Sequence, residues 1–98
     1  MLEPREPLPF LYFGLGNLYS RQNQWAPAQA AYFQAYQMQP DNPDYAYNLA
    51  IGLEHLSQPK LALTYYRKAL ELSFQKGRAN FDQSRVIERI GQLSARVN

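Results

Sequence analysis

A chain of 98 residues, 46% hydrophobic and 18% charged, has the composition of one small globular domain and leaves no room for a second. The absence of cysteine excludes disulfides, thiolate catalysis and the common structural zinc sites. A formal net charge of +2 is small for a nucleic-acid-binding protein, because that binding depends on many phosphate contacts.

Residues 1–8, MLEPREPL, form a proline-rich lead without an apolar run of signal-peptide length. No stretch of about 18 apolar residues follows in the rest of the chain. We therefore expect a soluble domain with no direct membrane insertion, either as a whole protein or as part of a longer one.

Residues 9–42 have the pattern of two helices. Apolar and small residues recur at helical spacing before and after a polar break at Arg21-Gln22-Asn23-Gln24. Pro27 lies where the first turn of the second helix tolerates proline. The segment Pro40-Asp41-Asn42-Pro43 then ends that helix and supplies capping side chains for the next.

Residues 43–76 repeat this plan, with Ser57 and Pro59 at the corresponding turn. Matching residues lie 34 positions apart throughout: Leu15 and Leu49, Gly16 and Ala50, Tyr19 and Leu53, Ala28 and Ala62, Tyr32 and Tyr66, Ala35 and Ala69. A fixed period of this length indicates an array in which each unit buries its apolar face against the next.

The two units resemble the tetratricopeptide repeat (TPR). The first carries the motif Tyr12-x-x-Leu15-Gly16-x-x-Tyr19, then Ala28-x-x-x-Tyr32, Ala35 and Pro40, and the second carries Leu49-Ala50-x-x-Leu53, Ala62-x-x-x-Tyr66 and Ala69. The resemblance implies an all-α stack of antiparallel helix pairs, a fragment of a right-handed superhelical solenoid. Small residues at positions 16, 50, 28 and 62 let the two helices of a repeat approach closely, whereas Gly14 has no such explanation.

Residues 77–98 predict a fifth helix that caps the second repeat. Its apolar stripe consists of Val86, Ile87, Ile90, Leu93 and Val97. Direct continuation of the 34-residue period pairs Phe81 with Tyr47, whereas a three-residue insertion, which we favour, places residues 86, 87 and 90 over residues 49, 50 and 53. A third alternative is one continuous helix over residues 60–96, whose free end would permit a swapped dimer.

No constellation for catalysis is present. His55 is the only histidine, and phosphate-binding loops, metal-ligand spacings and nucleophile motifs are absent from the sequence. The run Tyr65-Tyr66-Arg67-Lys68 has the residue types that bind single-stranded nucleic acid, but the repeat assigns Tyr66 to the core. We expect a protein that is not an enzyme, uses no cofactor or metal, and does not bind nucleic acid.

The resemblance implies that the first helix of each repeat lines a concave groove that binds a protein or peptide segment of unknown identity. The groove residues expected from it are Phe13, Asn17, Tyr47, Asn48, Ile51 and Arg85. Phe13 and Tyr47 share one repeat position, which predicts an aromatic strip along the groove.

One TPR subgroup binds a peptide's terminal carboxylate with lysine, asparagine and arginine. Asn17 and Asn48 match its asparagines, but Phe13 stands where the lysine belongs. We therefore expect a more apolar groove in which the two amides bond a peptide backbone and Arg85 contacts an acidic group.

The alternative is a scaffold segment that associates with copies of itself. Only two repeats and a cap are visible, fewer than the three that stability usually requires. The abundance of glutamine and tyrosine also resembles TPR segments of bacterial envelope or pilus-assembly proteins. In that case the aromatic surface would be an oligomer interface.

Overall fold

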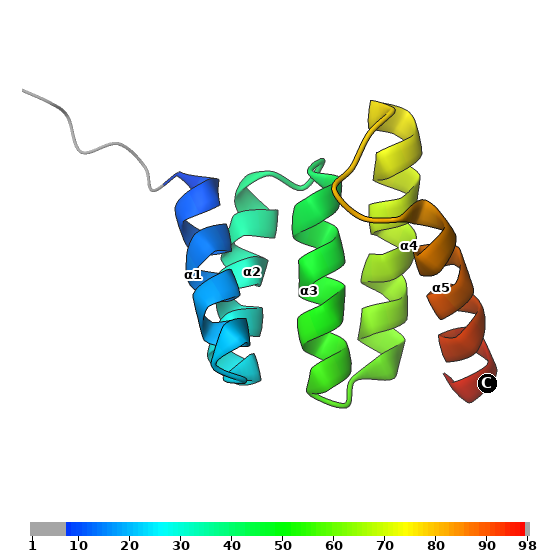
Figure 1. Ribbon diagram of the computed structural model, residues 1–98, viewed down its shortest axis with the longest axis horizontal. Coiled ribbons are helices and arrows are strands. Elements are labelled where there is room, and N and C mark those ends of the chain that lie inside the picture. The colour runs from blue at the N-terminus through cyan, green and yellow to red at the C-terminus, as the bar shows by residue number, and fades with distance from the viewer. Residues whose placement is uncertain (1–7, 98) are drawn as a thin grey trace, which may run out of the picture.

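The computed structural model describes residues 8–97 and shows five helices, with no strand in that range. The helices are α1 (Pro9–Arg21), α2 (Trp25–Met38), α3 (Pro43–His55), α4 (Pro59–Lys76) and α5 (Gln83–Val97). They lie side by side in chain order, from α1 at one end of the stack to α5 at the other (Figure 1). The predicted all-α stack is confirmed. The expected lead, residues 1–8, lies outside the described residues except for Leu8.

Each repeat is an antiparallel hairpin, α1 with α2 and α3 with α4, and the two hairpins meet where α2 packs on α3. The turns inside the hairpins are equivalent. Asn23 and Ser57, 34 residues apart, both adopt a left-handed backbone with φ of 60°. The 34-residue period in the sequence is therefore also present in the backbone.

Local signals explain where the helices begin and end. Prolines occupy the first turn of α1, α3 and α4, where no backbone N–H is needed. The side chain of Asn42 caps α3 by accepting hydrogen bonds from the backbone N–H groups of Asp44 and Tyr45, at 2.9 and 3.2 Å. The capping predicted between the repeats is confirmed.

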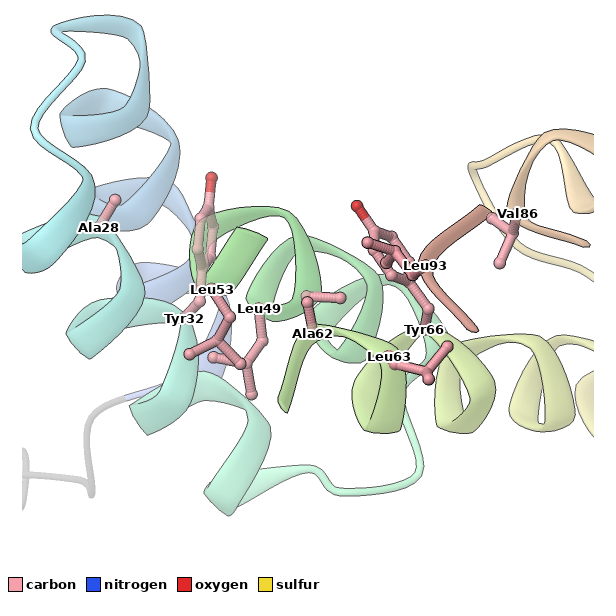
Figure 2. Close-up of a cluster of buried hydrophobic side chains, with 10 residues drawn as sticks. Ala28, Tyr32, Leu49, Leu53, Ala62, Leu63, Tyr66, Val86 and Leu93 are labelled. Atoms are coloured by element: carbon pink, nitrogen blue, oxygen red, sulfur yellow. The ribbon is translucent and has the colours of Figure 1, made fainter. Parts of the chain in front are cut away.

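The core runs through both hairpins and is built on the repeat positions. Tyr32 of α2 and Tyr66 of α4 are buried, and Figure 2 shows their hydroxyl ends pointing in the same direction. Ala28 and Ala62 are fully buried beside them. A Cβ added to Gly16 would lie 2.5 Å from the Tyr32 ring, so only glycine fits there without a shift of the ring.

The first helix departs from the repeat in one respect. Leu49 of α3 is fully buried, but Leu15, at the same repeat position, is 40% exposed. The reason is topological, because α2 covers α3 and no helix within residues 8–97 covers that side of α1.

The last two helices are separate. Gly77, with φ of 75°, ends α4 in the left-handed conformation that glycine favours, and α5 begins six residues later. The Asp82 carboxylate accepts hydrogen bonds from the backbone N–H groups of Ser84 and Arg85 at the start of α5. A continuous helix over residues 60–96 is therefore wrong, and the swapped dimer that would depend on it loses its basis.

The capping helix α5 packs on α4 through Val86 and Leu93, which are both buried. Direct continuation of the period aligns Phe81 with Tyr47 of α3, but Phe81 lies in the loop before α5, and its ring stacks on that of Tyr47. Ile87 is 52% exposed, although the favoured insertion aligns it with the buried Ala50. The difference arises because α4 covers Ala50, whereas no further helix follows α5 in the described chain.

Candidate protein-interaction face

Side-chain contacts connect α1 with α3 and α3 with α5. The ring centroids of Phe13 and Tyr45 lie 5.0 Å apart between α1 and α3. Glu54 and Arg89 form an ion pair between α3 and α5. We call the side of these three helices that carries Phe13, Glu54 and Arg89 the A-helix face, and the residues expected to bind a peptide lie on it or at its edge.

The two aromatic residues expected to form a strip both pack against the core, but their rings contact different aromatic neighbours. Phe13 packs on Tyr45 and lies 5.8 Å, centroid to centroid, from Tyr32. Tyr47 stacks on Phe81 at 4.6 Å and meets the edge of Tyr66 at 6.0 Å. Both rings are half-buried, so each presents only part of its surface to a ligand.

The two asparagines are each held at one end of the amide. Asn17 Oδ1 accepts a hydrogen bond of 2.7 Å from the Tyr32 hydroxyl. Asn48 Nδ2 donates a hydrogen bond of 2.9 Å to the Asp44 carbonyl one turn earlier. Within residues 8–97, this leaves the Asn17 NH₂ group as a donor and Asn48 Oδ1 as an acceptor without a partner.

The two other expected residues differ in exposure. Ile51 is half-buried and packs against the core. Arg85 is exposed in the first turn of α5, and its side chain forms no ion pair within residues 8–97. Arg85 is therefore placed to contact a ligand's acidic group without first breaking an internal ion pair.

A polar network at one edge of the face was not predicted from the sequence. Glu54, whose side chain is only 19% exposed, pairs with Arg89 and accepts a hydrogen bond of 2.8 Å from the Tyr66 hydroxyl. Burial, and secondarily the nearby Tyr47, raises the pKa of Tyr66 above its ordinary value. The partners lie on three different helices, so no local pattern could have identified them.

A second polar cluster ties the inter-helix loops together. The Asp44 carboxylate accepts hydrogen bonds from the backbone N–H and the side-chain amide of Asn80, at 2.8 and 2.9 Å. Lys76 pairs with Asp41 at 2.8 Å and thereby lowers the pKa of that carboxyl. These contacts line a surface pocket with Arg78 and attach the loop before α5 to the start of α3.

The only histidine has a structural contact. His55 stacks on Trp25 with ring centroids 3.7 Å apart, which joins the end of α3 to the start of α2. Within residues 8–97, no three histidine, aspartate or glutamate side chains gather as a metal site would require. No helix in the same range is long and apolar enough to span a membrane.

Comparison with known proteins identifies the fold. The sequence matches no protein-family model and no curated protein. The structure is similar to that of a tetratricopeptide repeat domain protein from Salinibacter ruber, with a TM-score of 0.77 and 19% sequence identity. The match covers 91% of this chain and 98% of that chain. This chain therefore has the fold of a tetratricopeptide repeat domain, as its repeat motifs predict.

Proposed function

We propose that this protein is a non-enzymatic interaction module whose A-helix face binds an extended peptide segment bearing a carboxylate. The observation that carries the proposal is the pair of half-satisfied amides. Asn17 and Asn48 are each fixed by one internal hydrogen bond, and the opposite end of each amide has no partner among the described residues 8–97. One therefore offers donors and the other an acceptor, which is what the N–H and C=O groups of a peptide backbone require.

The charge of the face favours an acidic ligand. Arg89 reaches Glu54 on α3, so the side of α5 that faces α3 is the side that carries Arg89. Arg85 lies one turn before Arg89 on the same side, and Arg96 lies two turns after it. Among residues 8–97, Arg89 is the one of these three arginines that pairs with an acid, so a ligand carboxylate would meet Arg85 and Arg96 at this edge.

Peptide selection tests the proposal. We would select binders from a phage-displayed library of random peptides and measure the affinity of the enriched sequences for the wild type. The variants Asn48→Ala and Arg85→Glu should each weaken binding at least tenfold, because one removes a backbone contact and the other reverses the charge that attracts the ligand. Both side chains lie outside the core, so circular dichroism should show unchanged helicity.

Lys60→Glu is the matched control. Lys60 is exposed at the start of α4, and its change reverses the same charge away from the A-helix face. This variant should bind like the wild type. Equal affinity of the wild type and the Asn48→Ala and Arg85→Glu variants would contradict the proposal, as would enrichment of peptides that lack acidic residues.

A further inference from the structure

The exposed side of α1 is almost entirely apolar. Leu11 is 57% exposed and Leu18 is 47% exposed, and both are large aliphatic side chains. The exposed residues of this helix are Phe10, Leu11, Gly14, Leu15, Leu18 and Arg21. Arg21, in the last turn, is the only charged residue in α1. A continuous exposed apolar surface of this kind marks an interaction site more often than a solvated face.

The second repeat shows what such a surface contacts in this fold. The residues of α3 that lie 34 positions after Leu11, Leu15 and Leu18 are all buried: Tyr45, Leu49 and Gly52. Gly52 lies against the backbone of Gln29 in α2, to which its Cβ position would be 3.5 Å distant. The side of α1 that carries Leu11, Leu15 and Leu18 is therefore equivalent to a side that another helix covers in the second repeat.

Gly14 supplies an independent observation. A glycine within a helix costs about 1 kcal/mol relative to alanine. Unlike Gly16, whose Cβ position meets Tyr32, Gly14 has no packing neighbour within 4 Å of its Cβ position among residues 8–97, so packing within this part of the chain does not explain it. It lies between Leu11 and Leu18 on the exposed side, where the absence of a side chain lets the backbone of a second helix approach closely.

We propose that a second copy of this chain covers this surface, with the two α1 helices packed antiparallel about a two-fold axis near Gly14. The surface is self-complementary in that arrangement. Leu11 lies three residues before Gly14 and Leu18 four residues after it, so the axis sets Leu11 of one copy against Leu18 of the other. The two glycines then lie close together at the crossing, where the helices approach most closely.

Charge favours the antiparallel arrangement over the parallel one. The two Arg21 side chains would adjoin in a parallel pair and repel each other. In the antiparallel pair they lie at opposite ends of a helix of 13 residues, which is about 20 Å long. With no other charge in α1, the remaining apolar residues meet without burying an unpaired ion.

The alternative contact between copies is head to tail, from α1 of one copy to α5 of the next. The exposed side of α5 offers one large apolar residue, Ile87, among polar and small ones. Such a contact would bury less apolar surface, and it would leave a free α1 at the end of every chain of copies. The two-fold dimer buries the exposed apolar side of α1 in both copies, so this surface is not left to bind a third copy.

The dimer should be weak. Each α1 is about 20 Å long and about 10 Å across. The area buried on the two copies together should therefore stay below the roughly 1,200 Å² of a standard interface. The dissociation constant of the dimer should therefore lie in the micromolar range or above, and the fraction of dimer should depend on concentration. This inference concerns a different surface from the A-helix face and does not depend on the proposed peptide binding.

Sedimentation velocity of the full chain over a hundredfold concentration range tests the inference. The wild type should pass from monomer to dimer, and its mass should level off at twice the chain mass. Leu11→Glu and Gly14→Gln should each weaken dimerisation at least tenfold, the first by burying a charge and the second by blocking close approach. Gly14→Gln should also raise the melting temperature of the monomer, because glutamine favours helix and the site is open.

Leu61→Glu is the matched control, because Leu61 is 46% exposed and lies on α4, not on the exposed apolar side of α1. It should dimerise like the wild type. A wild type that stays monomeric at every concentration would overturn the proposal, as would dimers that persist in Leu11→Glu or Gly14→Gln. Growth of the mass beyond two chains would overturn it in favour of head-to-tail association.

Discussion

The hydroxyl of Tyr66 donates a hydrogen bond of 2.8 Å to the carboxylate of Glu54, and Glu54 is also paired with Arg89 of α5. One repeat earlier, the equivalent Tyr32 donates instead to the neutral amide of Asn17 at 2.7 Å. Both repeats therefore have a buried tyrosine at the same repeat position, but its hydroxyl donates to a different acceptor in each. Only the second connects its tyrosine to the capping helix.

Removing the carboxylate at the centre of this network should destabilise the fold. Glu54→Ala leaves the Tyr66 hydroxyl and the Arg89 guanidinium without their partner, and we expect a loss of about 1–3 kcal/mol. Glu54→Gln keeps an oxygen that accepts from Tyr66 and should cost less. Urea denaturation measures both variants. A loss as large in Glu54→Gln as in Glu54→Ala would show that the ion pair, rather than the hydrogen bond, dominates.

Tyr66 should make stability fall at high pH. Burial raises its pKa in the folded protein above the ordinary value near 10. At a pH between the pKa of the unfolded chain and that of the folded chain, the unfolded chain has lost a proton that the folded chain retains. The contribution of this tyrosine to stability is therefore complete below about pH 10 and falls as pH rises further. The loss is at most about 1.4 kcal/mol per pH unit, and solvent screening makes it smaller.

Tyr66→Phe checks the assignment, because phenylalanine does not ionise. Denaturation measured between about pH 9 and 11 should show a shallower loss of stability in this variant than in the wild type. The slope will not vanish, since burial also raises the pKa of Tyr32, Tyr36 and Tyr45. Parallel slopes for the two proteins would mean that Tyr66 ionises in the folded state as easily as in the unfolded chain.

The two glycines of α1 should respond oppositely to the same substitution. Gly16→Ala places a methyl group 2.5 Å from the Tyr32 ring, and we expect overpacking to cost about 1–3 kcal/mol. Gly14→Ala meets no packing neighbour within 4 Å among residues 8–97 and should stabilise the monomer by up to about 1 kcal/mol through helix propensity. Thermal denaturation at a concentration where the chain is monomeric compares them. Similar effects of the two substitutions would contradict this difference in packing.

Asp44 should hold the loop that precedes α5. In Asp44→Ala the backbone N–H and the side chain of Asn80 both lose their acceptor. We expect a modest loss of about 1 kcal/mol, because the group is only half-buried, together with faster hydrogen exchange at Asn80. Asp41→Ala is the control, since Asp41 pairs with Lys76 and does not contact Asn80. Unchanged exchange at Asn80 in Asp44→Ala would count against this role.

Helix packing decides which rings the two expected groove aromatics contact. Phe13 and Tyr47 share a repeat position, but Phe13 packs on Tyr45 whereas Tyr47 stacks on Phe81. The repeat pattern predicts the positions of the two rings on their helices. It does not predict their neighbours, because Phe81 comes from the loop of residues 77–82 before α5, which is longer than the corresponding loop of residues 39–42 before α3.

The sequence by itself determined the helical hairpins and their period. Helix spacing, prolines in the first turns and the Asn42 cap are local signals, and small residues 34 positions apart require two helices to approach closely. The tertiary structure alone decided which surfaces remain exposed. Leu15 and Leu49 have the same local pattern, yet only Leu49 is buried, because burial depends on whether a neighbouring helix lies against that side.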